Sequence, residues 1–322
     1  MIVDPALAPI SGEHGLRSLR LSVAGRLTQF GAYLETLAPG VWSSQRHWHS
    51  AEDEFLYLLS GTATLHDDHG MRDLFPGDSC AWRHGDPNGH HLTNRGDVPA
   101  VWLIVGSRCK GDICTYPDDG RRQINEATTW RIEAADGAVL KSGDLPAELL
   151  NLPKPWGTAF AGSPRPNVLR ASESAWATDN PTHPITGPGP GPYGYCLLSD
   201  PGGLTQFGAF LEELPPGSSS GHRHWHEAED EMVYMLEGQA VLVEDRETSI
   251  GPGDTLCWPA NLPIGHRIDN RSDSRVRYLV IGTRLQRDVV HYTDHDLVTH
   301  KDGATRRYLR RDGTEYPVRR AP

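Results

Sequence analysis

The sequence predicts an all-β protein that contains two similar antiparallel β-barrels or jelly rolls. Three features of the chain support this class. Its 322 residues are enough for two domains that each bury a core. Its 34 glycines and 25 prolines suit many short strands joined by turns. A segment near residue 27 recurs 177 positions later, so the chain contains an internal duplication.

The duplication spans whole domains. The segment LTQFGA begins at Leu27 and again at Leu204, and residues 27–54 match residues 204–231 at 20 of 28 positions. A period this long indicates two complete domains rather than an array of small repeats. We therefore predict an N-terminal domain at residues 1–140 and a C-terminal domain at residues 195–322. Residues 141–194 contain a Pro- and Gly-rich stretch and are interpreted as a connecting segment.

Short apolar runs within each repeat predict strands. Residues 55–59 and 232–236 are five-residue apolar runs, followed in each repeat by an alternating segment and later by a β-rich segment. Pro-Gly and other turn signals separate these runs every ~8–12 residues. The chain has no pattern typical of a long amphipathic helix.

Charge and cysteine content exclude several classes of protein. The 31 Lys and Arg residues against 42 Asp and Glu residues give a net charge of −11, which argues against nucleic-acid binding. We expect neither a membrane span nor a secretory signal, because no apolar run approaches ~20 residues. The five cysteines include no CxxC pair, which argues against a disulfide scaffold or a cysteine zinc site. A cytoplasmic location is therefore expected.

A histidine motif occurs once in each repeat. Residues 46–54 read RHWHSAEDE and residues 223–231 read RHWHEAEDE. The two histidines of HxH project from the same face of a strand, and the last Glu begins an apolar strand. A further histidine follows a PxG turn. The candidate metal ligands are His47, His49, Glu54 and His90 in the first repeat and His224, His226, Glu231 and His266 in the second.

Three imidazoles and one carboxylate suit transition metals better than Ca²⁺ or Mg²⁺, which prefer oxygen ligands. We predict one divalent transition metal per domain, with Fe(II) favoured and Mn, Zn, Ni, Co or Cu as alternatives. A single HxH would be a weak signal, but the same ligands recur in the same order. Glu52 and Asp53 are competing carboxylates. His91 competes with His90, although Arg267 at the matching place favours His90.

These residues resemble the two motifs of the cupin superfamily. The first, G(X)5–6HXH(X)3–4E(X)6G, is met by Gly40, His47, His49, Glu54 and Gly61 and by Gly217, His224, His226, Glu231 and Gly238. The second is met by Gly77, Pro87, Gly89, His90 and Asn94 and by Gly253, Pro263, Gly265, His266 and Asn270, with longer spacing before PXG than in the shortest cupins. The resemblance covers roughly residues 20–120 and 195–300 and indicates a bicupin of the small bacterial type.

The resemblance implies a double-stranded β-helix in each domain, with a metal held by three histidines and one glutamate. It also implies self-association through sheet edges, so a homodimer is a reasonable expectation. The HWH triplet is similar to that of bicupin oxalate decarboxylases, although the rest of the sequence does not follow them closely.

Other polar residues near the ligands are pocket candidates. Gln29 and Gln206 are expected either to line the cavity or to form cross-strand hydrogen bonds. Arg46 and its counterpart Arg223 are expected to pair with the acidic turn rather than to bind a substrate carboxylate. Trp82 and Trp258 are expected either to line the entrance of the pocket or to fill the core. His91 and His222 are the last two candidates, and the two repeats differ at these positions.

Three functions are compatible with this pattern. A metal with open coordination positions favours a dioxygenase-type oxidoreductase that acts on a small organic molecule. A metal acting as a Lewis acid would suit an isomerase, lyase or decarboxylase instead. A metal-dependent binding protein without turnover is the third. The sequence assigns no catalytic residue beyond the metal ligands and does not identify the substrate.

Overall fold

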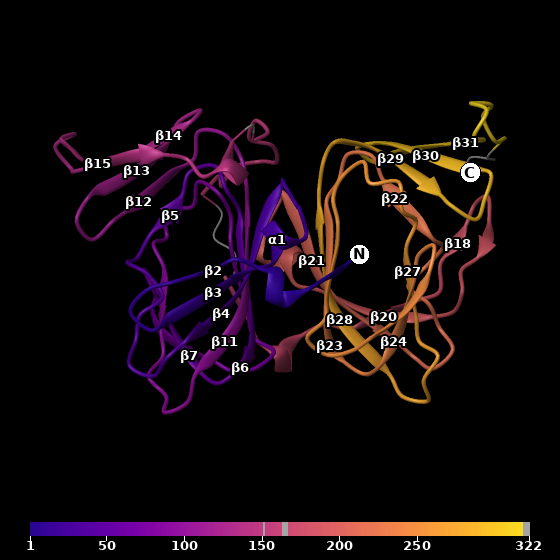
Figure 1. The fold of residues 1–322 in the computed structure, drawn as a ribbon, viewed down its shortest axis with the longest axis horizontal. Coiled ribbons are helices and arrows are strands. Elements are labelled where there is room, and N and C mark those ends of the chain that lie inside the picture. The colour runs from indigo at the N-terminus through magenta and orange to yellow at the C-terminus, as the bar shows by residue number, and fades with distance from the viewer. Residues whose placement is uncertain (151, 163–166, 318–322) are drawn as a thin grey trace. The chain divides into compact units, whose positions relative to one another are not determined.

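The computed structural model describes residues 1–150, 152–162 and 167–317, and it is almost entirely β-structure. The all-β prediction is confirmed. The chain divides into two compact units, each containing one β-barrel (Figure 1). The N-terminal unit contains Asp4–Ser174 and Leu198–Gly208, and the C-terminal unit contains Met1–Val3, Ala175–Leu197 and Ala209–Pro322. The predicted connection, residues 141–194, is thus divided between the units, and its residues 151 and 163–166 lie outside the described part.

The N-terminal unit is built on a seven-stranded sheet in the order β16-β9-β6-β11-β4-β3-β2. These strands are β2 (Ile10–Ser11), β3 (Leu16–Arg20), β4 (Phe30–Leu37), β6 (Glu54–Ser60), β9 (Ser79–Trp82), β11 (Ala100–Ser107) and β16 (Val168–Leu169). A three-stranded sheet contains β7 (Ala63–Asp67), β8 (Gly70–Leu74) and β10 (His91–Thr93). A third sheet contains β5 (Trp48–His49), β12 (Ile113–Tyr116), β13 (Arg121–Asn125), β14 (Thr129–Glu133) and β15 (Val139–Asp144).

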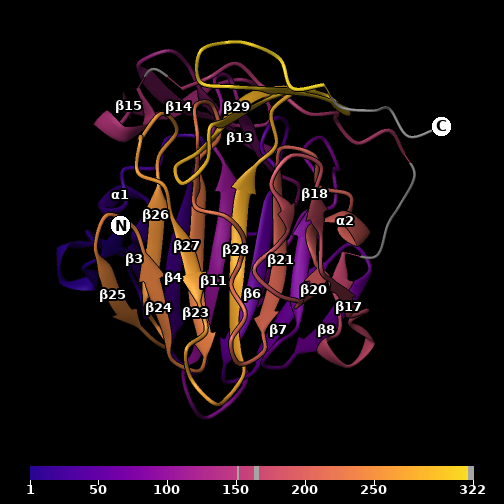
Figure 2. The same ribbon diagram turned by 90° about the vertical axis from the view of Figure 1, so that its right-hand side faces the viewer.

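The C-terminal unit repeats this plan, and its larger sheet has the order β1-β26-β23-β28-β21-β20-β17 (Figure 2). These strands are β1 (Ile2–Val3), β17 (Ala177–Asp179), β20 (Tyr193–Leu197), β21 (Phe207–Leu214), β23 (Glu231–Glu237), β26 (Thr255–Trp258) and β28 (Val276–Thr283). A three-stranded sheet contains β24 (Ala240–Val243), β25 (Glu247–Ile250) and β27 (Arg267–Asp269). A four-stranded sheet contains β22 (His224–His226), β29 (Arg287–Tyr292), β30 (Leu297–Asp302) and β31 (Thr305–Leu309). A two-stranded sheet contains β18 (Thr182–His183) and β19 (Gly187–Pro188).

Helices are short. They are α1 (Leu21–Ala24) and α2 (Ser199–Gly202), with single 3₁₀ turns at Pro5–Leu7, Ala147–Leu149 and Ala171–Glu173. Within the described residues, no helix is long and apolar enough to span a membrane.

The predicted apolar runs form the central strands β6 and β23. Leu56 and Leu58 on β6 pack with Trp102 on β11, and all three are fully buried. Met235 and Tyr278 occupy the same place in the other unit. Gly61 ends β6 with a φ of 74°, a conformation that favours glycine, and a Cβ at this position would clash with the Pro99 carbonyl.

Candidate metal centres

The N-terminal centre is built where two sheets face each other. His47 and His49 flank Trp48 on β5, Glu54 begins β6, and His90 lies in the loop before β10. Paired backbone hydrogen bonds join His47 to His90, with N···O distances of 3.2 and 3.0 Å. Glu54 Oε2 lies 3.1 Å from His90 Nε2 and 4.0 Å from His49 Nε2. The four predicted ligands of this repeat therefore lie together.

The C-terminal centre has the same arrangement. Glu231 Oε2 lies 3.2 Å from His266 Nε2 and 3.8 Å from His226 Nε2. The imidazole centroid of His224 lies 5.1 Å from that of His226 and 5.3 Å from that of His266. The second set of predicted ligands is also brought together, so the duplication extends to the geometry of the site.

Hydrogen bonds orient every one of these imidazoles through Nδ1. His47 Nδ1 lies 2.8 Å from the Gln45 carbonyl oxygen and His90 Nδ1 lies 3.3 Å from that of Asn88. A carbonyl only accepts, so Nδ1 carries the proton and Nε2 keeps its lone pair for the centre. His224 and His266 bond in the same way to the carbonyls of His222 and Ile264.

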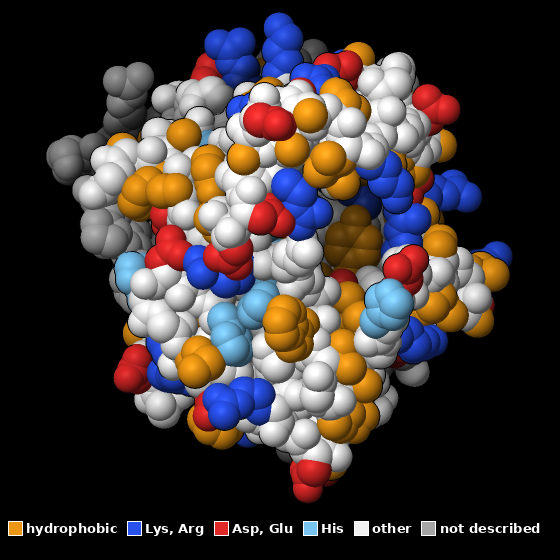
Figure 3. Space-filling model, turned by 90° about the vertical axis from the view of Figure 1, so that its left-hand side faces the viewer, with side chains coloured by type: hydrophobic (Ala, Val, Ile, Leu, Met, Phe, Trp, Pro, Cys, Tyr) orange, Lys and Arg blue, Asp and Glu red, His pale blue; other side chains and the backbone are white. Residues whose placement is uncertain are grey.

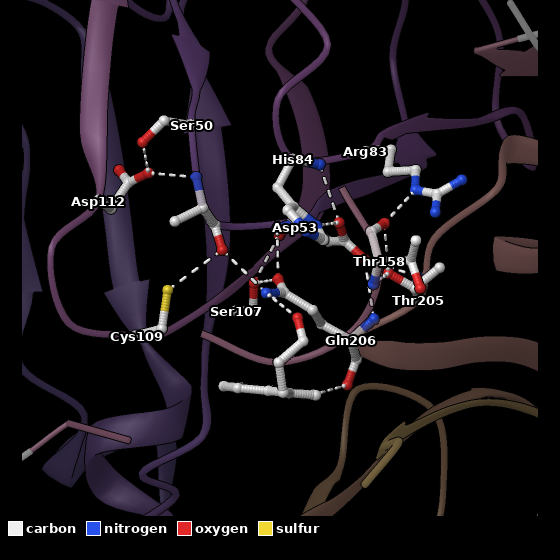
Figure 4. Close-up of polar contacts among 12 residues, drawn as sticks. Ser50, Asp53, Arg83, His84, Ser107, Cys109, Asp112, Thr158, Thr205 and Gln206 are labelled. Atoms are coloured by element: carbon white, nitrogen blue, oxygen red, sulfur yellow. Dashed lines mark hydrogen bonds and ion pairs between the residues drawn. The ribbon is translucent and has the colours of Figure 1, made fainter. Parts of the chain in front are cut away.

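The third histidine of each centre is held by a buried aspartate that sequence reasoning missed. Asp112 Oδ2 lies 2.7 Å from His49 Nδ1, and Asp288 Oδ2 lies 2.6 Å from His226 Nδ1. Asp112 Oδ1 also accepts from the Ala51 N–H, as Figure 4 shows. Carboxylates in this position fix the ring and raise the basicity of a metal-binding imidazole. Comparing the repeats at the 176-residue offset would have found the pair.

Trp82 and Trp258 lie against the remaining histidines. The Trp82 ring stacks on His90 with centroids 3.8 Å apart, and Trp258 stacks on His266 at 3.7 Å. Both tryptophans are buried. Each one therefore limits the motion of an imidazole, and Trp258 also lines the cavity beside its centre.

The electrostatics of the two centres agree. Burial would raise the pKa of Glu54, but His90, His47 and His49 together lower it to about 2. The pKa of Glu231 is also lowered to about 2, by its three histidines acting against burial. Burial lowers the pKa of His47 to about 4. Each centre therefore combines a carboxylate with at least one neutral imidazole at neutral pH.

The donor set fits a transition metal. His90 Nε2 and Glu54 Oε2 are both acceptors once Nδ1 carries the imidazole proton, yet they lie only 3.1 Å apart. Such a pair is stable only with a cation, a proton or a metal ion, between the two atoms. Nitrogen and carboxylate donors are those that Fe, Mn, Co, Ni, Cu and Zn accept.

The competing carboxylates of the acidic turn have other partners. Glu52 Oε1 accepts from the Cys109 N–H, and burial raises the pKa of Glu52 to about 8. Asp53 is fully buried and accepts from the His84, Thr205 and Gln206 N–H groups (Figure 4). Glu54 is the carboxylate of this turn that lies within 3.1 Å of His90.

Each centre opens into a cavity inside its barrel. The N-terminal cavity has a volume of about 330 Å³, and its apolar wall contains Leu92, Trp102 and Ile104. The C-terminal cavity has a volume of about 280 Å³ and an apolar wall of Phe210, Val233 and Val280. The face of the N-terminal barrel in Figure 3 is hollowed, with hydrophobic side chains at the floor of the hollow and charged side chains around it.

Both cavities contain an acid that sequence reasoning also missed, and Glu212 is buried whereas Glu35 is half-buried. Glu35 on β4 and Glu212 on β21 occupy equivalent positions at the 177-residue offset. Burial raises the pKa of Glu35 to about 7 and that of Glu212 to about 8. Each acid lines the same cavity as the candidate metal ligands of its unit.

The glutamine candidates do not line either cavity. Gln206 Nε2 donates to the Ala51 and Trp156 carbonyls, and Gln206 Oε1 accepts from the Asp53 N–H (Figure 4). Gln206 thus holds the turn that leads into Glu54. Gln206 immediately precedes β21, so these are hydrogen bonds from a loop side chain and not bonds between paired strands. At the equivalent position, the backbone carbonyl oxygen of Gln29 accepts a hydrogen bond from the Arg108 N–H.

The histidine candidates differ between the repeats. His91 lines the N-terminal cavity and packs edge-on against His66, with centroids 4.9 Å apart. His222 lies outside the C-terminal cavity, in a neighbouring hollow with His183. Its Nδ1 lies 3.2 Å from His295 Nε2. The two centres therefore have different surroundings.

The expectation for the two arginines was wrong. Arg46 and Arg223 do not pair with the acidic turn: Arg46 pairs with Asp68 and Asp118, and Arg223 pairs with Asp294 at 2.7 Å. These arginines point away from the centre. Each one pairs with an aspartate in a following loop, Asp118 after β12 or Asp294 after β29. His84 is buried and bonds to Asp53.

Comparisons with known proteins agree with this geometry. A family model described as a cupin domain matches residues 33–106 and again residues 210–282. The chain belongs to the cupin superfamily. Because both matches lie in one chain, this cupin protein is a bicupin, as the sequence predicted.

Quercetin 2,3-dioxygenase of Bacillus subtilis strain 168 is 24% identical to this bicupin over 73% of the chain and 69% of its own length. The structure of an oxalate decarboxylase from Lactobacillus farciminis has a TM-score of 0.53 and 17% identity, covering 88% of this chain and 86% of that one. A sugar phosphate isomerase structure from Silicibacter pomeroyi is 37% identical, with a TM-score of 0.41, and covers 43% of this chain and 96% of that one.

Proposed function

We propose that each cupin domain holds one divalent transition metal, with Fe(II) favoured. The proposed ligands are the three imidazoles and one carboxylate of each centre. The observation that carries this proposal is the facing pair of acceptors, His90 Nε2 and Glu54 Oε2, and its counterpart His266 and Glu231. The buried Asp112 and Asp288 support it, because such carboxylates commonly orient metal-binding histidines.

The activity that we propose is oxidation of a small organic molecule by a dioxygenase-type reaction. Similarity to quercetin 2,3-dioxygenase supports this class. A bound transition metal would supply open coordination positions and the redox chemistry that side chains lack. The small molecule would occupy the cavity beside each centre.

The protein's own residues would bind and orient that molecule. Leu92, Trp102 and Ile104 offer an apolar wall that excludes water from the N-terminal cavity. Gly106 lies directly across from Glu54 in the sheet, and a Cβ there would meet no atom within 4 Å. The absence of a side chain leaves room for a substrate beside the carboxylate.

A second candidate is non-oxidative chemistry by an isomerase, lyase or decarboxylase. The acids Glu35 and Glu212 favour it, because reactions of these classes move protons to or from a substrate. Binding without turnover is the third candidate.

Metal analysis tests the proposal. We expect one transition metal per domain in protein purified without added metal, and loss of one per chain in each of His47→Ala and His224→Ala. A parent protein that retains no transition metal after loading with Fe(II), Mn(II) or Zn(II) would contradict the proposal. A matched control is His14→Ala, because His14 is exposed and remote from both ligand sets.

Oxygen uptake separates the candidate activities. Iron-loaded protein should consume O₂ when supplied with a flavonol such as quercetin or another small phenol. Turnover that persists without O₂ would favour isomerase or lyase chemistry, and tight binding without turnover would favour the third candidate. The cytoplasmic location and the homodimer stay predictions.

A further inference from the structure

Each cavity contains one carboxyl group that the metal centre does not use. Glu35 Oε2 accepts a hydrogen bond from Trp102 Nε1 at 3.0 Å. Glu212 Oε1 accepts from the Tyr278 hydroxyl at 2.9 Å. The donor differs between the repeats, an indole in one and a phenol in the other, whereas the acid is the same.

The sheet register places Glu35 farther inside the barrel than Glu54. Glu54 pairs with Gly106, and Gly106 pairs with Gly31 on β4. Glu35 follows Gly31 by four residues, so both have the same orientation on the strand, about 13 Å apart at ~3.3 Å per residue. The proposed metal ligands and Glu35 therefore lie at two positions along one inward face, with open space at Gly106 beside Glu54 and the Tyr33 ring lying against Gly31.

Among the residues that the structure describes, no cation pairs with either acid. The groups that act on Glu35 are Ser18, Trp102 and Glu54, and those that act on Glu212 are Tyr278 and Glu231. Within the described part of the chain, neither acid forms an ion pair with Lys or Arg. A buried carboxyl with only neutral donors and a like-charged neighbour is most stable as the neutral acid.

Accepting a hydrogen bond from Trp102 or Tyr278 does not by itself require a carboxylic acid at this position. Glutamine would accept the same bond through its amide oxygen without the cost of a buried ionisable group. What the acid adds is a proton that can be transferred. The same acid occurs in both cavities although its hydrogen-bond donor has changed.

We propose that Glu35 and Glu212 each exchange a proton with an oxygen of the bound substrate, at the end of the molecule remote from the metal. This inference rests on the proposed function and names its substrate class. The substrate is a largely apolar molecule with an oxygen near the metal and an ionisable hydroxyl at its other end, such as a polyhydroxylated aromatic compound or an enol.

The proton balance is simple. The carboxyl O–H bond breaks as an O–H bond forms on a phenolate or enolate oxygen of the substrate. The resulting carboxylate keeps its hydrogen bond from Trp102 Nε1 or the Tyr278 hydroxyl, which stabilises the charge. The carboxylate recovers a proton from the hydroxyl of the next substrate molecule or from water, so no oxidant or reductant is required.

Infrared difference spectra of the full-length zinc-loaded protein, with and without bound quercetin, test the inference. Zinc is redox-inert, and quercetin has hydroxyl groups at the end remote from its keto and enol oxygens, so loss of the carboxylic acid band on binding reports transfer of the carboxyl proton to the bound molecule. The variants are Glu35→Gln, Glu212→Gln and the double variant. The matched control is Glu213→Gln, because Glu213 neighbours Glu212 in sequence but pairs with Arg277.

We expect the double variant to retain the zinc content of the parent protein, to bind the probe at least roughly tenfold more weakly and to show no carboxylic acid band that changes on binding. Infrared spectra near pH 7 should show a protonated carboxyl band in the parent and in Glu213→Gln that the double variant lacks.

Zinc retention with unchanged affinity and an unchanged infrared band in the double variant would overturn this inference and leave the proposed metal centres standing. A zinc-loaded parent that does not bind quercetin would overturn the substrate class. A parent that binds no metal would overturn the proposed function itself, and the infrared band would then still report the protonation of both acids.

Discussion

Asp112 Oδ2 lies 2.7 Å from His49 Nδ1, and only 1% of the Asp112 side chain is exposed. The carboxylate is thus withdrawn from water and directed at the imidazole nitrogen that faces away from the metal ligands. Although burial opposes it, Asp112 raises the pKa of His49 well above its ordinary value. The same relationship joins Asp288 to His226 at 2.6 Å.

Replacing this aspartate should weaken metal binding at one centre only. We expect Asp112→Asn to lower metal affinity at the N-terminal centre about 10–100-fold, because the amide neither fixes the imidazole tautomer nor raises its basicity. Competition with a chelator measures the change. Asp119→Asn is the control, since Asp119 is exposed and pairs with Arg121. Equal metal retention in Asp112→Asn and the parent would contradict this role.

Removing the Gln206 side chain should destabilise the N-terminal unit. Gln206 is fully buried, and its amide bonds to Ala51, Asp53, Ser107 and Trp156. We expect Gln206→Ala to lower the free energy of unfolding on the order of 2–4 kcal/mol, because buried partners lose their hydrogen bonds. Thermal unfolding measures the change, and exposed Gln239→Ala serves as the control. A melting temperature equal to that of the parent would rule this role out.

The two cavity acids should make stability fall as the pH rises. The pKa of Glu35 is about 7 in the folded protein and that of Glu212 is about 8, both above the ordinary value of 4.5. The folded state therefore binds more protons than the unfolded state between about pH 4.5 and 8, and stability decreases across that window.

Substitution of both acids by Gln removes this dependence. We expect the double variant to gain stability relative to the parent as the pH rises from 5 to 8, by a few kcal/mol in total. Melting temperatures of parent and variant across that range, without added metal, measure the difference. A difference that stays constant with pH would show that neither acid titrates in the window.

Filling the space beside Glu54 should block the N-terminal cavity and leave the metal bound. We expect Gly106→Val to retain the metal content of the parent and to bind 4-nitrocatechol at that site at least tenfold more weakly, because the branched side chain occupies the open space across from the carboxylate. Gly106→Ala is the milder control. Unchanged probe binding in Gly106→Val would place the substrate elsewhere.

Much of the fold and the candidate ligand set could be predicted from the sequence. The repeat of LTQFGA and of the HWH triplet established two equivalent domains, and the two-residue period of a strand predicted that His47 and His49 share a face. Local patterns carry this information, because both the strand period and the turn residues act within a few positions of the chain.

The cavity acids could not be predicted, because nothing local distinguishes them. Glu35 occurs in a segment, YLETL, that is compatible with an exposed Glu on a half-buried strand. Its environment depends on Trp102, 67 residues away in the sequence, which donates a hydrogen bond to it. Asp112 likewise becomes a partner of His49 only when β12 pairs with β5.

The sequence by itself determined that the chain is a duplicated β-barrel protein with a histidine-rich ligand set in each copy, because repeats and strand periodicity are written along the chain. Only the tertiary structure decided which other side chains serve those ligands. The aspartates behind the histidines, the glutamine that holds the acidic turn and the neutral acid in each cavity all depend on contacts between strands distant in sequence, where burial sets the charge of each group.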